Sequence, residues 1–185
     1  MQSHPRLVVL DRDGTLNLDD KAIIAGPDDW VPVAGALEAV ARLNQAGCRV
    51  VIATNQSGLG RGLFDADTMN RVHAKMNKLL AAVGARVDAV FFCPHSRDDA
   101  CDCRKPKPGM FKRIADTFNV DLKCVPAIGD SLRDLQACAA LGCQPMLVLT
   151  GKGEKTKAEG NLPENTLEFA NLAAAIEHLL GKDKK

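Results

Sequence analysis

Residues 6–15 read RLVVLDRDGT, an apolar run of mostly branched side chains that leads directly into Asp11-Arg12-Asp13-Gly14-Thr15. Short runs of this kind are typical of strands that are buried on both faces. Asp11 and Asp13 stand two positions apart where the backbone leaves the predicted strand, so both carboxylates can face one cleft. An Asp-Gly turn with a capping threonine would use the same letters for a structural purpose. The position directly after a buried strand favours a functional site.

Four further apolar runs, with amphipathic helical patterns between them, extend this strand into a sheet. Strands that alternate with helices predict right-handed crossovers and a mostly parallel sheet with helices on both faces, a three-layer Rossmann-like α/β fold. Glycines at 47, 84 and 142 follow three of the helical patterns, as expected for helix C-termini. The predicted strands are 6–10, 49–53, 88–92, 124–128 and 145–149, and the predicted helices are 34–46, 65–83, 108–118, 131–141 and 172–180.

Polar side chains follow four of the predicted strands. In parallel α/β sheets, ligands bind in the crevice outside the carboxyl ends of the strands. Taken singly, a hydroxyl or carboxylate at such a position is often only a helix cap or turn residue. Taken together, they predict one active site. The residues are Asp11 and Asp13 after the first strand, Thr54 and Asn55 after the second, Lys105 in the loop after the third, and Asp130 after the fourth.

The composition is that of an ordinary globular protein, with 185 residues of which 46% are hydrophobic and 25% charged. We expect a single domain spanning 1–185, with a frayed tail at 181–185. A formal net charge of +1 gives no general attraction for nucleic acid or an anionic membrane. No apolar stretch approaches the roughly 20 residues that cross a bilayer, and no secretory signal precedes the first strand, so we expect a cytoplasmic protein.

Three of the seven cysteines lie with a histidine in residues 93–103, as CPH at 93–95 and CDC at 101–103. Three thiolates and one imidazole suit tetrahedral zinc, and four protein ligands leave no position for water, so the zinc would be structural. A disulfide is the alternative, but the expected compartment is reducing. We predict a zinc-stapled loop that presents residues 104 and 105. Its ligands are Cys93, His95, Cys101 and Cys103, and the predicted core cysteines are Cys48, Cys124, Cys138 and Cys143.

The order DxDGT, a threonine after the second strand, a lysine and then GDxxxD resembles the four-motif signature of the haloacid dehalogenase phosphatases. The resemblance implies that Asp11 attacks phosphorus and forms an aspartyl-phosphate, while Asp13 serves first as acid and then as base. Thr54 and Lys105 would hold the transferring oxygens. It also implies that magnesium is bound by Asp11, Asp130 and the main-chain carbonyl of Asp13, because this ion prefers oxygen ligands.

Within that superfamily, the zinc loop running into CRKPKPGM and the segment TNQSGLGRGLF resemble the bacterial heptose 1,7-bisphosphate phosphatases. Those enzymes remove the 7-phosphate of D-glycero-D-manno-heptose 1,7-bisphosphate for lipopolysaccharide core or other glycans. The resemblance implies a small phosphorylated sugar as partner. It implies substrate contacts from Arg12, Asp19, Asp20, Lys21, Ala22, Asn55, Gln56, Ser57 and Arg104.

Histidinol-phosphate phosphatases are the alternative, because they share DRDGT, TNQ and CDCRKPK, and because the zinc loop is short. The heptose interpretation is favoured by the Ser57-Gly58, Arg61-Gly62 and Pro108-Gly109-Met110 segments. Ser131 departs from the basic residue expected after Asp130 in some heptose enzymes.

Two other classes of function fit less well. A nucleic-acid 3′-end phosphatase uses DxDGT chemistry but needs a basic groove and stacking aromatics, and the chain has six Phe, one Trp and no Tyr. A non-catalytic zinc-stapled module would not need the intact motifs.

Only about forty residues separate Asp13 from Thr54, so we expect no large cap domain, an open site and a monomer. We expect flexible loops at 58–62 and 151–153, Trp30 in the core, and His73 as a surface or packing residue.

Overall fold

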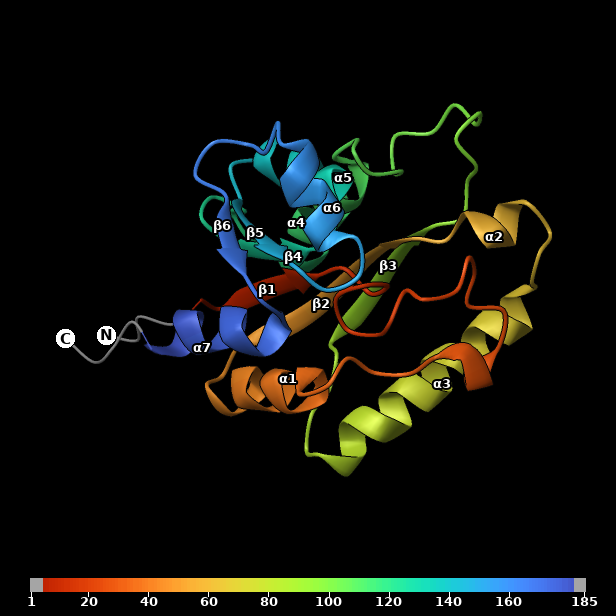
Figure 1. The fold of residues 1–185 in the computed structure, drawn as a ribbon, viewed down its shortest axis with the longest axis horizontal. Coiled ribbons are helices and arrows are strands. Elements are labelled where there is room, and N and C mark those ends of the chain that lie inside the picture. The colour runs from red at the N-terminus through yellow and green to blue at the C-terminus, as the bar shows by residue number, and fades with distance from the viewer. Residues whose placement is uncertain (1–4, 182–185) are drawn as a thin grey trace.

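A computed structural model of the chain describes residues 5–181 (Figure 1). Its strands are β1 (Leu7–Leu10), β2 (Arg49–Asn55), β3 (Ala89–Cys93), β4 (Pro126–Gly129), β5 (Gln144–Val148) and β6 (Leu167–Phe169). Its helices are α1 (Ala36–Gln45), α2 (Ser57–Gly60), α3 (Ala66–Ala82), α4 (Gly109–Phe118), α5 (Leu132–Ala139), α6 (Gly153–Glu159) and α7 (Leu172–Gly181), with a short 3-10 helix, η1, at Pro27–Asp29. Within these residues the strands form one parallel sheet in the order β3-β2-β1-β4-β5-β6. The predicted α/β fold is confirmed.

All five predicted strands and all five predicted helices are present, with ends shifted by one to a few residues. The additional elements carry weak sequence signals. β6 has three residues, too few to show a period, and α6 has the polar sequence GEKTKAE. The flexible loops expected at 58–62 and 151–153 were wrong in part, because α2 covers Ser57–Gly60 and α6 begins at Gly153. Gly181 ends α7, and the rest of the predicted frayed tail, 182–185, lies outside the described residues.

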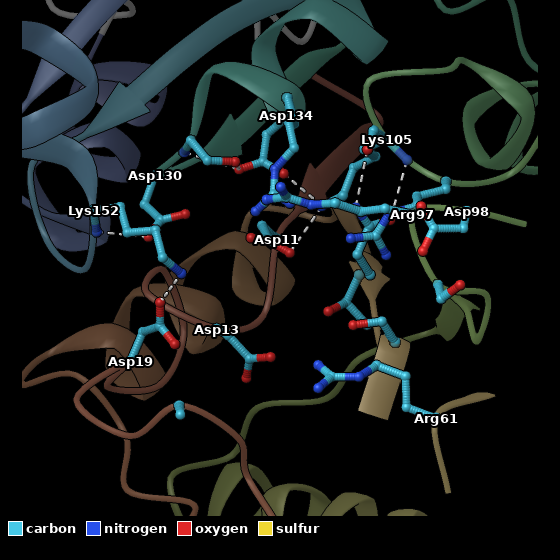
Figure 2. A pocket seen from close by; sticks show the side chains of 18 residues that line it. Asp11, Asp13, Asp19, Arg61, Arg97, Asp98, Lys105, Asp130, Asp134 and Lys152 are labelled. Atoms are coloured by element: carbon cyan, nitrogen blue, oxygen red, sulfur yellow. Dashed lines mark hydrogen bonds and ion pairs between the residues drawn. The ribbon is translucent and has the colours of Figure 1, made fainter. Parts of the chain in front are cut away.

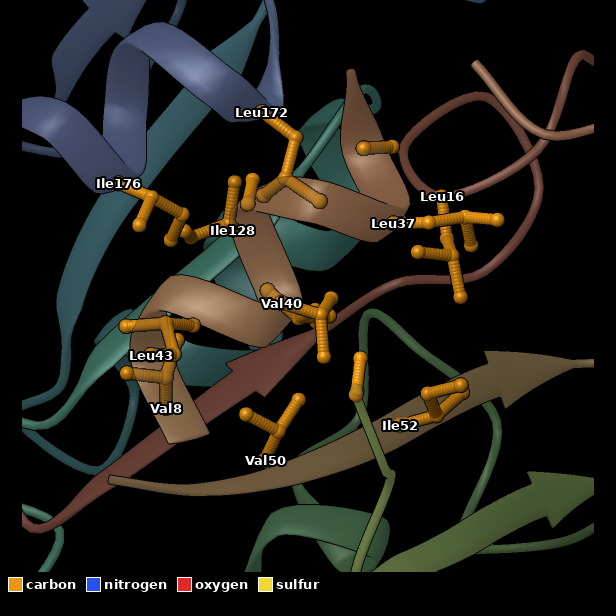
Figure 3. Close-up of a cluster of buried hydrophobic side chains, with 14 of the residues drawn as sticks. Val8, Leu16, Leu37, Val40, Leu43, Val50, Ile52, Ile128, Leu172 and Ile176 are labelled. Carbon is orange, nitrogen blue, oxygen red and sulfur yellow. The ribbon is translucent and has the colours of Figure 1, made fainter. Parts of the chain in front are cut away.

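The side chains of the central strands alternate between two cores, one on each face of the sheet. Val8 and Leu10 of β1 join α1, α3 and α7, as Figure 3 shows in part. Leu7 and Val9 instead join α4 and α5. Because successive residues of a strand point to opposite faces, a strand buried on both sides has to be apolar throughout, which explains the LVVL sequence of β1.

Trp30 is fully buried, as predicted, and Cys48, Cys138 and Cys143 are buried as well. Cys124 was wrongly assigned to the core. It is exposed, with a φ of 61°, in the turn before β4, which begins only at Pro126.

The sheet order places a crevice at the carboxyl ends of β1 and β4. From β1 the chain builds the sheet outward through β2 and β3, and from β4 it builds outward in the other direction through β5 and β6. The connections therefore diverge between these two adjacent strands, which is where doubly wound folds bind ligands. Within residues 5–181 no separate cap domain interrupts the sheet. None of the helices in this part of the chain is long and apolar enough to cross a membrane.

Candidate active site

A cavity of about 520 Å³ opens at the carboxyl ends of the strands (Figure 2). It brings together the predicted catalytic and magnesium residues from four strand ends. Asp20 and Lys21 lie outside its lining and are exposed, and Lys21 forms an ion pair with Asp29. Arg12 and Gln56 are buried beside Asp13 rather than lining the cavity. The predicted residues that do line it are Asp11, Asp13, Asp19, Ala22, Thr54, Asn55, Ser57, Arg104, Lys105 and Asp130.

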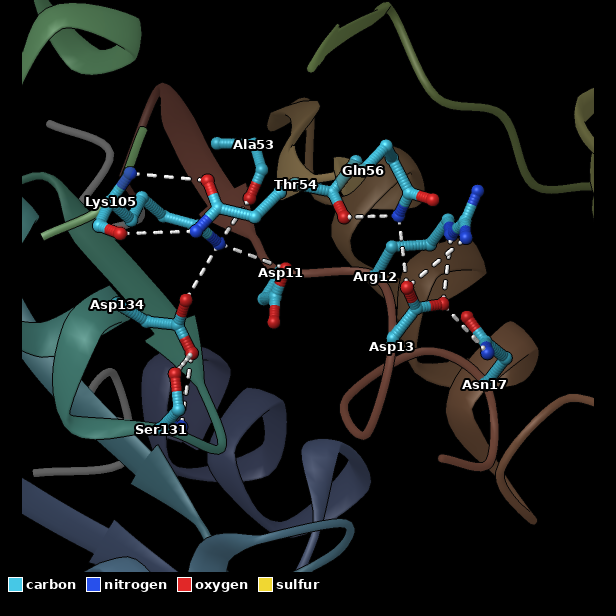
Figure 4. A network of polar contacts seen from close by, with 11 residues as sticks. Asp11, Arg12, Asp13, Asn17, Ala53, Thr54, Gln56, Lys105, Ser131 and Asp134 are labelled. Carbon is cyan, nitrogen blue, oxygen red and sulfur yellow. Dashed lines mark hydrogen bonds and ion pairs between the residues drawn. The ribbon is translucent and has the colours of Figure 1, made fainter. Parts of the chain in front are cut away.

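Lys105 is the buried centre of the site (Figure 4). Its Nζ donates to the Asp11 carboxylate at 2.9 Å, to the Ala53 carbonyl at 2.6 Å and to the Asp134 carboxylate at 2.6 Å. Burial lowers the pKa of Lys105, but the two carboxylates outweigh it and hold this pKa above its usual value. The ammonium is therefore charged and fixed in direction, next to the proposed nucleophile.

Asn55 fixes the backbone that carries Lys105. The Asn55 side chain donates to the Lys105 carbonyl and accepts from the Lys105 N–H, both at 3.1 Å. The end of β2 is thereby joined to the loop after β3. These two hydrogen bonds satisfy two backbone groups of the loop and fix the position of the Lys105 main chain, from which its side chain extends.

Asp134 was missing from the predicted site residues, although GDxxxD carries it as its second carboxylate. One Asp134 oxygen meets Lys105, and the other accepts from the Ser131 N–H at 3.0 Å and the Ser131 hydroxyl at 2.6 Å, which forms a capping box at the start of α5. Burial opposes ionisation, yet Lys105 and Ser131 hold the pKa of Asp134 below its usual range. Asp134 thus helps to orient Lys105 toward Asp11.

Oxygens of Asp11, Asp130 and Asp134 lie within 4.8 Å of one another. Burial and mutual repulsion raise the pKa of Asp11 to about 7 and that of Asp130 to about 8. The three carboxylates, of which Asp130 and Asp134 are buried, share one buried lysine, Lys105, so the cluster lacks positive charge. A divalent cation with a preference for oxygen would supply it, and these residues fit magnesium.

Two glycines make room for the Asp130 carboxylate. A Cβ at Gly14 or at Gly151 would overlap the same Asp130 oxygen, and both residues have positive φ, 84° and 56°. That oxygen accepts from the Lys152 N–H at 2.8 Å. The main chains of the loops after β1 and β5 therefore pack directly against the Asp130 carboxylate.

Gly151→Ala is expected to lower magnesium affinity at least about 10-fold by displacing the Asp130 carboxylate. Gly84→Ala is the control, because Gly84 also has positive φ, 73°, but a Cβ there would face open space. Both variants place a Cβ at a residue of positive φ, so calorimetric titration with magnesium separates the effect of the overlap from that of the backbone conformation. Equal magnesium affinity in the two variants would contradict this account of Gly151.

Magnesium affinity is expected to rise with pH. In the metal-free protein, Asp11 and Asp130 are largely protonated below their pKa values of about 7 and about 8, and magnesium must displace those protons. The apparent Kd should therefore fall as pH rises from about 6 to about 8 and level off above that. Titrations in buffers of different ionisation enthalpy should reveal the released protons. A Kd that is constant across this range would contradict the expectation.

The Asp13 carboxylate is held by four donated hydrogen bonds (Figure 4). Arg12 donates through Nε at 2.9 Å and Nη2 at 3.1 Å, Asn17 at 3.0 Å and Gln56 at 2.9 Å. Burial raises the pKa of Asp13, but Arg12 and the other donors outweigh it and hold this pKa below its usual range. Gln56 also donates to the Thr54 hydroxyl at 2.8 Å, which leaves the Thr54 proton to be donated elsewhere.

The Cys93, His95, Cys101 and Cys103 ligand atoms converge within 4.8 Å of one another. Four of the six separations between these atoms run from 3.2 Å, between the sulfurs of Cys103 and Cys93, to 3.8 Å, between those of Cys93 and Cys101. A tetrahedron with zinc bonds of about 2.0–2.3 Å has edges of about 3.3–3.8 Å. All of these cysteines are free of disulfides. The donor set and its geometry are consistent with the predicted zinc-binding loop.

The cavity also contains cationic residues that sequence reasoning missed, namely Arg61, Arg97, Arg133 and Lys152. Arg97 lies in the zinc loop and Arg133 on α5, so no sequence spacing places them together. Burial lowers the pKa of Arg104, and the nearby charges of Arg133 and Arg97 lower it further. We call Arg97, Arg104 and Arg133 the arginine cluster. They are exposed or half-buried, whereas Asp130 and Asp134 are buried.

The fold and the site define a doubly wound hydrolase with an aspartate as its candidate nucleophile, and the family model for haloacid dehalogenase-like hydrolases matches residues 11–142. A D-glycero-beta-D-manno-heptose-1,7-bisphosphate 7-phosphatase of Bordetella bronchiseptica is 57% identical over 95% of this chain and 98% of that protein. The enzyme of that name from Pseudomonas aeruginosa is 48% identical over 94% of this chain and 97% of its own. The chain belongs to the haloacid dehalogenase-like hydrolases and, within them, to the heptose-1,7-bisphosphate 7-phosphatase family.

A crystal structure of a D,D-heptose 1,7-bisphosphate phosphatase from B. bronchiseptica, complexed with magnesium and phosphate, superimposes with a TM-score of 0.94. It is 56% identical and covers 96% of this chain and 99% of that chain. The magnesium in a structure this similar agrees with the carboxylate cluster of Asp11, Asp130 and Asp134.

Proposed function

We propose that this protein removes the 7-phosphate from D-glycero-beta-D-manno-heptose 1,7-bisphosphate, through an aspartyl-phosphate on Asp11 and with magnesium. The relatives support the reaction, and the arginine cluster is the observation that supports the bisphosphate as substrate. Burial and the charges of Arg133 and Arg97 lower the pKa of Arg104, and all three guanidinium groups line the same cavity as Asp11. Such a cluster attracts a second phosphate and repels the ammonium group of histidinol phosphate.

In the first half of the reaction, the Asp11 carboxylate attacks phosphorus as the bond from phosphorus to the sugar oxygen breaks. Asp13 in its acid form gives a proton to that oxygen. Lys105, held by Asp134, and the free proton of the Thr54 hydroxyl steady the transferring oxygens. Magnesium, held by Asp11, Asp130 and the Asp13 carbonyl, would neutralise charge between the carboxylates and the phosphate.

In the second half, Asp13 is a carboxylate and takes a proton from the water that attacks phosphorus. The bond between Asp11 and phosphorus breaks, which releases inorganic phosphate and restores the Asp11 carboxylate. The four donors around Asp13 favour the ionised state needed here, and by lowering its pKa they make its acid form a stronger proton donor in the first half.

Phosphate release from heptose 1,7-bisphosphate and from histidinol phosphate, measured side by side with magnesium, tests the proposal. We expect kcat/KM to be at least about 100-fold higher for the bisphosphate, because a site built for a charged group rejects a substrate that lacks it. NMR of the product should show the phosphate retained at position 1. A kcat/KM for histidinol phosphate equal to or above that for the bisphosphate would overturn the assignment.

We further propose that the cysteine cluster binds zinc and that the zinc serves substrate recognition. The carbonyl of the ligand His95 accepts from the Arg104 guanidinium at 3.0 Å, so the loop and the arginine cluster are linked directly. Cys101→Ser is expected to raise KM for the bisphosphate about 10-fold or more and to alter kcat less. Elemental analysis of the wild-type protein without bound zinc would refute this. Asp102→Ser, at an exposed position between the ligands Cys101 and Cys103, is the control.

A further inference from the structure

We propose that His73 is a positioning residue for the reaction: it holds Arg12, and Arg12 aims the Asp13 carboxylate. The inference rests on the proposed role of Asp13 as acid and base. Arg12 stands between the two residues, with Nη1 at 3.2 Å from His73 Nε2 and with Nε and Nη2 on the Asp13 oxygens. His73 thus acts on the chemistry without touching the cavity.

Arg12 needs this support because it is a long cation with 1% of its surface exposed. A buried guanidinium is stable only if its N–H groups find acceptors. The fork toward Asp13 uses two of its three nitrogens, and His73 accepts from the third. Fixed at both ends, the guanidinium plane cannot turn about its long axis, so the Asp13 carboxylate is held in one orientation.

His73 is suited to this role because it is neutral. Half-burial and the neighbouring Arg12 charge lower the pKa of His73 to about 4. Near pH 7 its Nε2 therefore carries a lone pair and accepts from Arg12. His73 belongs to α3, which is remote in sequence from the loop after β1. Its contact with Arg12 therefore fixes the position of that loop relative to α3.

A comparison of substrates with different leaving groups shows whether His73 positions Asp13 or only supports the fold. A sugar alkoxide leaves slowly unless Asp13 protonates it, whereas 4-nitrophenolate leaves without a proton. The ratio kcat/KM reports only steps up to transfer to Asp11. Misaligned Asp13 should therefore lower kcat/KM for a sugar phosphate and leave kcat/KM for 4-nitrophenyl phosphate nearly unchanged.

The test compares His73→Leu with His73→Gln, whose carbonyl oxygen can replace Nε2 as an acceptor. We expect His73→Leu to lower kcat/KM about 10- to 100-fold for heptose 1,7-bisphosphate and less than about 2-fold for 4-nitrophenyl phosphate. His73→Gln should recover most of the loss. Lys78→Leu, exposed on the same helix, controls for a leucine on α3. Should His73→Leu fail to fold, His73→Asn, with a shorter reach, takes its place.

The variant Asp13→Asn completes a double-mutant cycle. If His73 acts through Asp13, His73→Leu should cause little further loss of sugar-phosphate hydrolysis in that background. An equal loss on both substrates, no loss on either, or full additivity with Asp13→Asn would overturn the inference. If the wild type fails to hydrolyse the heptose substrate, the proposed function fails by itself. The same comparison with fructose 1,6-bisphosphate then still tests His73.

Discussion

Asp11→Asn is expected to leave a folded protein whose kcat falls by at least about 10⁴-fold. An amide is a poor nucleophile and a poor magnesium ligand, and removal of a catalytic nucleophile generally costs this much. The fold should survive because the ionised Asp11 carboxylate destabilises the folded state. Burial and the Asp134 charge raise its pKa to about 7, above the value of about 3.9 in an unfolded chain.

The sign of that pKa shift makes the prediction sharper. A carboxyl group with a raised folded pKa reduces stability as pH rises from about 4 to about 7. In magnesium-free buffer at pH 8, Asp11→Asn should therefore have a Tm equal to or above that of the wild type, and the difference should shrink toward pH 4. Phosphate release and thermal unfolding on the same samples check both halves. Near-normal turnover would exclude Asp11 as the nucleophile.

Lys105→Met is expected to reduce both activity and stability. The methionine keeps much of the length but leaves Asp134 and Asp11 without their buried cation, and breaking a buried ion pair typically costs about 3–5 kcal/mol. Loss of the donor to the transferring oxygens should lower kcat about 10²- to 10³-fold. Lys112→Met, on the exposed face of α4, is the control for loss of a lysine charge.

The stability loss in Lys105→Met should depend on pH. Lys105 holds the folded pKa of Asp134 below its unfolded value, so this pair stabilises the fold above about pH 4, and the stabilisation is lost as pH falls further. Urea unfolding should therefore show a larger difference from the wild type at pH 7.5 than at pH 4. A difference independent of pH would mean that packing, and not charge, accounts for the role of Lys105.

The fold and the central catalytic residues were predictable because their signals are local. A buried strand is apolar along most of its length; Asp11 and Asp130 directly follow such strands, and Thr54 is the last residue but one of another. The pairing of Lys105 with Asp134 was not predictable in this way, since it joins a loop after β3 to α5. The same holds for Arg12: its position in DRDGT suggested substrate contact, whereas tertiary packing buries it between Asp13 and His73.

The arginine cluster was incompletely predicted for the same reason, because its residues come from separate segments that meet only in the folded protein. Arg104 lies next to Lys105 and was expected at the substrate, but Arg97 and Arg133 reach the cavity from a loop and a helix with no common pattern. Ser131, which lacks the expected basic side chain, is buried in the capping box with Asp134. Arg133, two positions further on, supplies a cation at the cavity instead.

Asp130 and Asp134 are buried in the cavity, whereas the arginine cluster is exposed or half-buried, and this difference affects the end of the catalytic cycle. In the proposed reaction, hydrolysis removes the phosphate next to Asp11, and the sugar monophosphate keeps the phosphate that we propose the arginine cluster binds. The attraction that speeds arrival of the substrate therefore also slows departure of the product. Salt weakens both, because dissolved ions screen exposed charges over a Debye length of about 10 Å at 0.1 M. Moderate ionic strength thus hastens product release while it impairs capture of dilute substrate, and the best salt concentration depends on how much substrate is present.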